Sequence, residues 1–380
     1  MSAPTKNPFK FGDPVEGEYY YPRPELTKTV QQFLDNKIHV VLIGPRRFGK
    51  TSFIIDTIHK EEQQGKTCIL IDIFNVTSHR DFLQQLIREL SAKKNWAGKL
   101  KEWAKSVPKL RPKFSLQTDA DTGETTFSLQ PELSSDKDIK ELIQDTLVAF
   151  GKIGEDVIVA IDEFQTVSEL DDSGWLEATL RTQMQQIKNT TFFFSGSRRS
   201  IIYDMLNNPR RPFYKTCQMI EFPVLPDDFT DWIIKRFKSV DISCDKHAIT
   251  ELRKLVQDTP NYVQMACFHL VAAGITHVNL SKVREILNTI VKQNAYAYQT
   301  LLNSLTAPQQ RALRLAAKEG EEIFSKEVRK KYEIASSPAL ASSVHALKQK
   351  QILDDEGTKR GKVIFDDPLF AIWLRLEFPE

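Results

Sequence analysis

One short stretch, residues 40–52, constrains the fold of this chain more than any other part of the sequence. It reads Val-Val-Leu-Ile-Gly-Pro-Arg-Arg-Phe-Gly-Lys-Thr-Ser and fits G-x-x-x-x-G-K-[ST], the glycine-bounded loop that cradles phosphate groups. Gly44 and Gly49 permit backbone angles and a close approach that a Cβ atom would block. The N–H groups from Arg47 to Ser52 are then expected to converge on an anion at a helix N-terminus, where the dipole favours negative charge.

The residues on either side of this loop match the structure that it requires. Residues 38–43 are apolar and mostly β-branched apart from His39, which is typical of a buried parallel strand. Residues 52–64 carry apolar side chains at helical spacing and stop at Gly65. Lys50 is expected to reach the β- and γ-phosphates of a nucleotide, and the Thr51 hydroxyl is expected to ligate Mg²⁺. The predicted phosphate-binding residues are Gly44, Pro45, Arg46, Arg47, Phe48, Gly49, Lys50, Thr51 and Ser52.

Length and composition indicate a globular chain of several domains. A chain of 380 residues has room for about two to three domains. Its 41% hydrophobic and 27% charged residues are ordinary for a protein with a packed core, and a net charge of +2 gives no overall basic field for nucleic acid. The four cysteines are scattered, and neither a membrane-spanning run nor a signal-peptide pattern occurs. We therefore expect a cytoplasmic protein without a membrane partner.

Residues 1–22 are rich in turns and aromatic side chains and are too few to build a core, so we expect this strap to pack over another domain. One interpretation places Phe9, Phe11 or Tyr21 near an adenine base, with Arg23 at the entrance of the next helix. The other makes these aromatic residues an apolar plug without ligand contact. The sequence leaves both open.

Strands and helices alternate after the phosphate loop. Residues 67–74 form a second buried strand, and a helix with apolar positions up to Leu90 follows, which predicts a parallel sheet covered by helices on both faces. An insertion of about residues 93–135 interrupts this alternation of strands and helices. Residues 93–113 hold eight basic residues against one acid, and residues 114–130 predict a β-hairpin. The basic segment suits either nucleic acid or a membrane surface, or a solvated face, which we favour.

A further apolar strand, residues 156–163, ends in two adjacent carboxylates. Asp162 is expected to hold Mg²⁺, and Glu163 is expected to orient and polarise the attacking water. A carboxylate at this position favours hydrolysis over transfer to a small substrate. Together with the phosphate loop, Asp162 and Glu163 predict an ATPase in which Glu163 and Lys50 are the catalytic residues.

Polar residues also follow the strand predicted at residues 190–194, at the point where it would lie beside the γ-phosphate. Ser195 or Ser197 is a candidate phosphate sensor, and Arg198 or Arg199 is a candidate phosphate contact, with a surface salt bridge as the alternative for each arginine. Further along, Arg210 or Arg211 is a candidate arginine finger acting on a neighbouring copy, which would require a nucleotide-dependent oligomer. The sequence-based binding site thus includes Ser197 and Arg198 beside the loop residues.

The order of these motifs resembles the archaeal-type ATPase family, a branch of the AAA+-related STAND P-loop NTPases. The matching segments are residues 7–14, 23–26, 44–52, 72–78, 161–165, 196–197, 211–214 and 367–370. The resemblance implies an α/β fold with an AAA+-like parallel sheet core, a helical lid and a C-terminal winged helix. It also implies ATP as the nucleotide and a signalling or DNA-linked switch role. We expect a strap and ATPase core over residues 1–226, a lid over 227–300 and a winged helix over 301–380.

The winged helix suggests DNA or protein as a partner. Its three helices are expected at residues 307–318, 324–332 and 338–350, with a wing at residues 352–365. If the third helix entered a major groove, four side chains would face bases and three would face phosphates. The base-facing residues would be Ser337, Ser342, Ser343 and His345, and the phosphate-facing ones Lys359, Arg360 and Lys362. However, residues 306–380 hold 13 basic residues against 12 acids, so protein contact is at least as well supported.

Two hypotheses for the function follow. The first is an ATP-hydrolysing P-loop ATPase that acts as a nucleotide-dependent molecular switch. The second is a DNA-binding regulator in which ATP fixes the conformation with little turnover.

Overall fold

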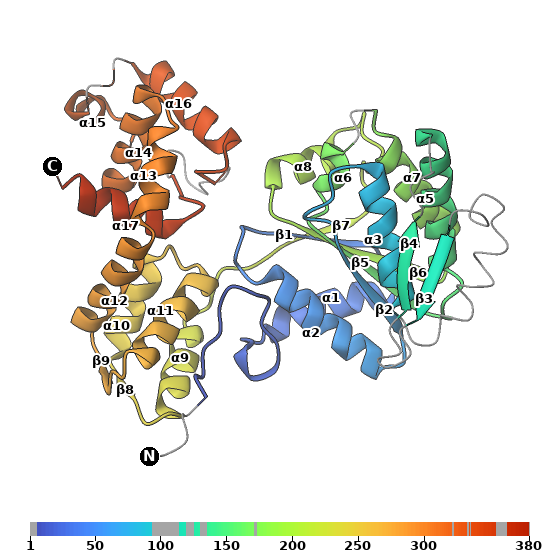
Figure 1. Ribbon diagram of the computed structural model, residues 1–380, viewed down its shortest axis with the longest axis horizontal. Coiled ribbons are helices and arrows are strands. Elements are labelled where there is room, and N and C mark those ends of the chain that lie inside the picture. The colour runs from blue at the N-terminus through green and yellow to red at the C-terminus, as the bar shows by residue number, and fades with distance from the viewer. Residues whose placement is uncertain are drawn as a thin grey trace. The chain divides into compact units, whose positions relative to one another are not determined.

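The computed structural model describes residues 6–92, 114–118, 125–129, 135–170, 173–320, 323–332, 334, 336–354 and 363–379, with residues 114–118 and 125–129 described by their backbone alone. These residues divide into two compact units (Figure 1). The sheet unit comprises Pro22–Gly44 and Lys50–Pro223, and the helical unit comprises Met1–Tyr21, Pro45–Gly49 and Val224–Glu380.

The sheet unit is built on five parallel strands in the order β2-β5-β6-β1-β7. Numbered within this sheet along the chain, the order is 2-3-4-1-5. The strands are β1 (Val40–Ile43), β2 (Thr67–Asp72), β5 (Val157–Asp162), β6 (Thr190–Gly196) and β7 (Gln218–Glu221). The three central strands are buried along their whole length, as continuous apolar runs in a parallel sheet require. The predicted P-loop sheet is therefore confirmed.

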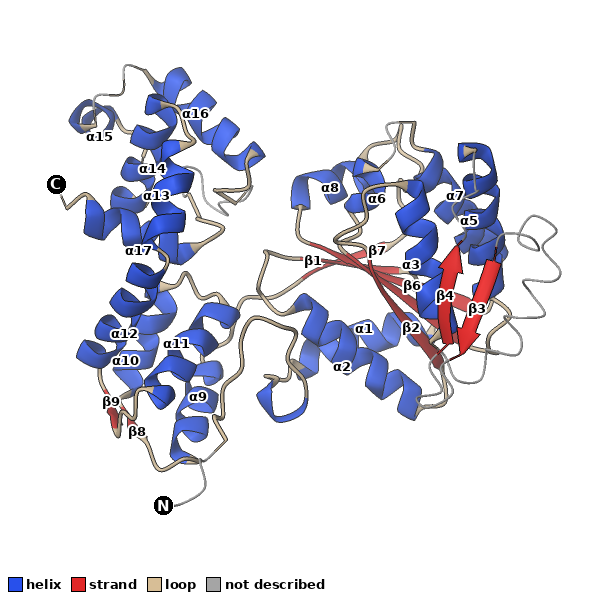
Figure 2. Ribbon diagram, viewed as in Figure 1, coloured by secondary structure: helices blue, strands red, loops and turns tan. Residues whose placement is uncertain are grey.

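Helices cover both faces of this sheet (Figure 2). One face packs on α3, α5 and α7 through a core that includes Val41, Ile71 and Phe194. Helices α1 and α2 lie against the other face, where Phe53 meets Phe222. The helices of the unit are α1 (Pro24–Asp35), α2 (Lys50–Gln63), α3 (His79–Ser91), α5 (Asp136–Phe150), α6 (Thr166–Glu169), α7 (Trp175–Gln186) and α8 (Arg199–Asn207).

The insertion contains the predicted hairpin. Strands β3 (Phe114–Thr118) and β4 (Thr125–Leu129) pair antiparallel, with Leu116 opposite Phe127. The predicted basic helix of residues 93–113 lies outside the described residues.

His39 couples the stability of the sheet unit to pH. Its Nδ1 accepts a hydrogen bond from the backbone N–H of Phe192 at 3.0 Å, so the ring serves as a neutral acceptor. Burial lowers the pKa of His39, and a hydrogen bond with the Met184 backbone opposes this effect. Because the folded pKa lies below the unfolded value of about 6.5, this contribution is complete above pH 6.5 and is lost as the pH falls through the folded pKa.

We expect the melting temperature of the wild type to fall between pH 7.5 and 5.5 more steeply than that of His39→Asn. Asparagine keeps an acceptor for the Phe192 N–H but does not titrate in this range. Differential scanning calorimetry at several pH values measures the difference. The exposed His247→Asn variant is the control, and the prediction is wrong if it changes the pH profile as much as His39→Asn does.

The first part of the helical unit is a bundle of four helices. They are α9 (Asp228–Lys238), α10 (Lys246–Leu255), α11 (Pro260–Ala272) and α12 (Leu280–Gln293), with the short parallel pair β8 (Ser243–Cys244) and β9 (His277–Val278). These helices correspond to the helical lid in the sequence-based fold prediction.

The N-terminal strap, which contains the 3₁₀ turn η1 (Gly17–Tyr19), packs on this bundle. Phe9 is buried against Phe237 with ring centroids 4.7 Å apart, and Tyr21 lies 5.0 Å from Phe229. Gly12 N donates to Asn261 Oδ1 at 3.0 Å. These contacts attach the strap to the bundle, and contact of its aromatic residues with an adenine base stays a prediction. The strap also groups with the helical unit, whereas the sequence analysis assigned it to the ATPase core.

The chain then forms the winged helix. Its elements are α13 (Ala295–Asn303), α14 (Ala307–Glu319), α15 (Lys326–Lys331), α16 (Ser337–Gln349) and α17 (Pro368–Glu377), with Leu353 bridged antiparallel to Phe365. On α16, Ser342 and His345 are exposed, but Ser343 is buried and donates to Ala339 O at 3.0 Å. The prediction that Ser343 faces DNA bases is therefore wrong, because its side chain closes a turn of its own helix. Residues 355–362, with Lys359, Arg360 and Lys362, lie outside the described residues.

Candidate nucleotide site

The phosphate loop has the backbone that its sequence predicts. Gly49 has a φ of +90° and Arg47 a φ of +62°, both in the left-handed region. Gly44 tolerates no side chain, because a Cβ atom there would lie 2.6 Å from the Cβ of Phe222. Helix α2 begins at Lys50, whose buried ammonium donates to Gly44 O at 2.9 Å across the start of the loop. The lysine and the helix N-terminus thus lie together, as anion binding requires.

The side chains of Arg46 and Arg47 bond to residues of the helical unit, with which residues 45–49 group. Arg46 Nη1 donates to Gln351 Oε1 at 2.8 Å. Arg47 Nη1 donates to the Tyr262 hydroxyl at 2.7 Å and lies 3.5 Å from a carboxylate oxygen of Asp366. The side chains of both arginines are therefore engaged within the helical unit.

Thr51 and Asp162 lie together, although 111 positions separate them in the sequence. The Thr51 hydroxyl donates to one carboxylate oxygen of Asp162, and the Ser195 hydroxyl donates to the other. Asp162 is 3% exposed and ends β5. A hydroxyl and a carboxylate are the hard oxygen ligands that Mg²⁺ prefers.

This pair fits the way in which Mg²⁺ binds beside a nucleotide. The ion keeps several waters and takes one or two protein ligands plus phosphate oxygens rather than a full protein cage. The described residues contain no group of three or more His, Cys, Asp or Glu arranged to hold a metal ion. Thr51 and Asp162 would hold Mg²⁺ through their oxygens only when a nucleotide supplies phosphate.

Glu163 is held in a fixed orientation at the carboxyl ends of β5 and β6. Its φ is +58°, a conformation uncommon for a residue with a side chain and often found at functional sites. Its carboxylate accepts hydrogen bonds from Ser197 Oγ at 2.9 Å and from Gln165 Nε2. Gln165 Oε1 in turn accepts from Ser197 N at 3.2 Å. A Cβ at Gly196 would lie 2.4 Å from Gln165 Oε1, so this glycine makes room for the network.

Gln165 was not predicted as a site residue from the sequence. The available signal was its position two residues after Glu163, where a long amide can reach back to the carboxylate.

Asp72 is a third carboxylate at the same edge of the sheet, and sequence reasoning also missed its role. It ends β2, directly opposite Asp162 in the parallel register. Burial raises its pKa, a hydrogen bond from the Phe74 backbone N–H lowers it, and the charges of Asp162 and Glu163 raise it further. The mutual repulsion of these acids makes a cation at this edge favourable. The available signal was that Asp72 ends a buried strand, as Asp162 does.

Two of the predicted arginines form ion pairs within the sheet unit. Arg198 pairs with Glu169 of α6. Arg211 Nη2 lies 2.6 Å from a carboxylate oxygen of Glu177, which is 1% exposed. Arg210 is exposed at the surface. Phosphate contact by Arg198 and a finger role for Arg210 or Arg211 stay predictions.

Two family models match parts of the chain. Residues 34–202 match the model of an AAA domain, and residues 296–376 match the model of a probable winged helix domain. The first contains the phosphate loop, Asp162 and Glu163, and the second contains α14, α15, α16 and α17 except for its last residue. No curated protein matches the chain. Within the described residues, no helix has the length and apolar character needed to cross a bilayer.

Solved structures share the fold along almost the whole chain. The Walker-type ATPase of Pyrococcus abyssi superposes with a TM-score of 0.65 at 17% identity, covering 94% of this chain and 97% of that one. The ORC2 protein of Aeropyrum pernix, solved as ADPNP–ADP complexes, gives 0.53 at 13% identity and 94% coverage of both chains. The ORC1 protein of A. pernix, solved in complex with DNA, gives 0.51 at 12% identity and covers 95% of this chain and 94% of that one.

Proposed function

We propose that this chain is an Mg²⁺-dependent ATPase that works as a nucleotide-dependent molecular switch. The proposal is supported by the match of residues 34–202 to an AAA domain and of residues 296–376 to a probable winged helix domain. The observation that carries the proposal is the hydrogen bond between Thr51 and Asp162, at the edge of the sheet where Lys50 and Glu163 also lie. Three separate segments of the chain converge there, namely residues 50–51, 162–163 and 195–197. This convergence supports hydrolysis of a bound triphosphate rather than a purely structural loop.

Each group has a distinct role in the proposed reaction. The backbone N–H groups of residues 47–52 and the ammonium of Lys50 bind the phosphates. Mg²⁺, when bound, would neutralise charge on the β- and γ-phosphate oxygens. Glu163 orients the attacking water and accepts its proton, while Ser197 and Gln165 hold the carboxylate in place. The ADP that remains lacks the γ-phosphate, so the protein loses the contacts that it made with this group. This loss of contacts would distinguish the ADP-bound conformation from the ATP-bound one.

Metal removal tests the proposal. Phosphate release by the full chain at saturating ATP is expected to fall to background in excess EDTA and to recover when Mg²⁺ exceeds the chelator. The reason is that Thr51 and Asp162 carry no positive charge, so a cation is needed to neutralise the phosphate oxygens beside them. A malachite-green assay measures the rate. A rate that is unchanged by EDTA, or no release at any Mg²⁺ concentration, contradicts the proposal.

DNA binding through the winged helix is a second candidate function. It is supported by the match of residues 296–376 to a winged-helix model and by the exposure of Ser342 and His345 on α16. The fold shared with an ORC1 protein solved on DNA agrees with this candidate. In this function, ATP would set the conformation in which α16 reaches a groove.

Neutralising Lys359 and Arg360 by glutamine is expected to weaken duplex binding and to reduce the salt dependence. Each lost phosphate contact lowers the slope of log K against log salt by about 0.9, so the slope should fall by about two. Fluorescence anisotropy at several salt concentrations gives the slope. Lys10→Gln/Lys28→Gln, which removes the same charge elsewhere, is the control. Equal slopes for both double variants would exclude a wing contact.

A further inference from the structure

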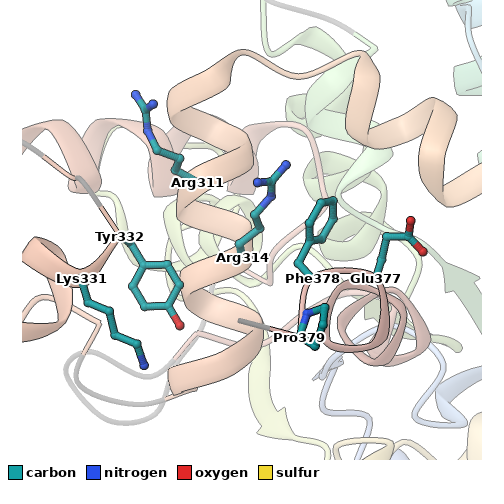
Figure 3. A pocket seen from close by; sticks show the side chains of 7 residues that line it. All are labelled: Arg311, Arg314, Lys331, Tyr332, Glu377, Phe378 and Pro379. Carbon is teal, nitrogen blue, oxygen red and sulfur yellow. The ribbon is translucent and has the colours of Figure 1, made fainter.

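The winged-helix domain contains a cationic pocket that neither proposed function uses. We call it the α14 pocket, because Arg311 and Arg314 on α14 form one wall. Figure 3 shows its lining side chains, which come from α14, the end of α15 and the end of α17. They are Arg311, Arg314, Lys331, Tyr332, Glu377, Phe378 and Pro379. Its volume of about 490 Å³ lies within the range of about 300–1,000 Å³ typical of small-molecule sites.

The positive charge of this pocket is only partly compensated. Lys331 and the Tyr332 hydroxyl both contact Glu319 at 3.1 Å, so this carboxylate is already occupied. Neither Arg311 nor Arg314 forms an ion pair with an acid among the described residues. The Glu377 carboxylate points away from both guanidinium groups (Figure 3). Two like charges three residues apart on one helix face repel each other, and a bound anion would remove this repulsion.

The orientation of Arg314 is fixed by an aromatic side chain. Its guanidinium lies 3.8 Å above the ring centre of Phe378, which itself packs edge-on against Trp373. The Nε atom of Arg314 is buried and has no hydrogen-bond partner among the described residues. A buried guanidinium N–H without an acceptor is unfavourable, so an anion near Arg314 would satisfy a group that the fold leaves unpaired.

We propose that the α14 pocket binds a small organic anion. The carboxylate or phosphate of this molecule lies between Arg311 and Arg314, because a guanidinium offers a planar pair of N–H donors that matches such groups. A flat apolar ring of the same molecule packs against Phe378 and Tyr332. Because Phe378 already holds Arg314 in place, little side-chain entropy is lost on binding. The ligand gives the winged helix an input separate from ATP.

The shape and position of the pocket favour a small molecule over the phosphates of a nucleic acid. Its walls belong to α14, α15 and the end of α17, whereas a winged helix reads a groove with α16. A concave site with two aromatic side chains also offers an apolar surface that a phosphate backbone does not use. These features favour a ligand that carries both an anion and a ring.

Isothermal titration calorimetry with phenyl phosphate tests the proposal. The full chain is first saturated with Mg-ADP, so that the P-loop does not contribute. Arg311→Gln is expected to weaken phenyl phosphate binding about tenfold, since it removes a charge-assisted hydrogen bond. Inorganic phosphate and phenol, each with half of the recognition chemistry, are expected to bind more weakly than phenyl phosphate. Lys330→Gln, an exposed change on α15 outside the pocket, is the control and should bind like the wild type.

The result does not depend on the packing role of Arg314. Arg311 is exposed, so its substitution leaves the fold intact, and Arg314→Lys serves as a second variant that keeps the charge but loses the planar fork. The proposal is overturned if wild type and Arg311→Gln bind phenyl phosphate equally, or if the wild type does not bind it. It is also overturned if Arg311→Gln weakens duplex DNA binding alone, because the pocket would then serve nucleic acid phosphates.

Discussion

Glu163→Gln is expected to lower the rate of ATP hydrolysis about a hundredfold or more while ATP still binds. Glutamine keeps the size of the side chain and an oxygen that accepts from Ser197 and Gln165, but it cannot take a proton from water. Loss of a positioned general base typically costs about 10²–10⁴ in rate. Because the backbone N–H groups of the loop and Lys50 are unchanged, the affinity for ATP should stay near that of the wild type.

Phosphate release and the binding of a fluorescent ATP analogue, measured on the same preparation, separate the two effects. Glu155→Gln, an exposed acid just before β5, is the control and should hydrolyse ATP like the wild type. Equal turnover by wild type and Glu163→Gln would contradict the role of Glu163 as base. A parallel loss of binding would mean instead that the substitution disturbs the loop.

Lys50→Ala is expected to abolish ATP binding at concentrations that saturate the wild type. Its ammonium is buried and donates to Gly44 O, so it is already directed toward the start of the phosphate loop. A charge-assisted contact of an ammonium with phosphate is roughly twice as strong as a neutral hydrogen bond, and alanine removes it completely. We therefore expect about a hundredfold or greater increase in the Kd for ATP, with hydrolysis lost as a consequence.

Titration with the same fluorescent analogue measures the affinity of Lys50→Ala. Lys60→Ala, on the surface of the same helix, loses a pair with Asp56 but no part of the loop, and it is the matched control. A circular dichroism melt checks that Lys50→Ala is folded. If the folded variant binds ATP as tightly as the wild type, the nucleotide does not lie in this loop.

The two variants together distinguish the two hypotheses for the function. An ATP-hydrolysing switch requires that Glu163→Gln is trapped with ATP bound, and that it differs in partner binding from Lys50→Ala. A DNA-binding regulator with little turnover requires that wild type and Glu163→Gln behave alike, whereas Lys50→Ala alone loses its salt-dependent retention of duplex DNA.

Local motifs predict most of the proposed phosphate site. Gly44, Gly49 and Lys50 act through backbone geometry and a helix start within one short stretch, so the sequence alone defines them. Asp162 was predictable for a related reason. The carboxyl ends of parallel strands lie at one edge of a sheet. Asp162, which ends one buried strand, is therefore expected near the phosphate loop, which follows another strand of the same sheet.

The tertiary structure decided what the remaining side chains do. The Gln165 bridge to Ser197, the position of Asp72 opposite Asp162 and the stacking of Arg314 on Phe378 all depend on strand register or helix packing between distant segments. The strap joined the helical unit because Phe9 and Tyr21 found aromatic partners there. Sequence periodicity tells which residues are buried, but the partner of each buried or half-buried side chain is set by long-range packing, which no local pattern contains.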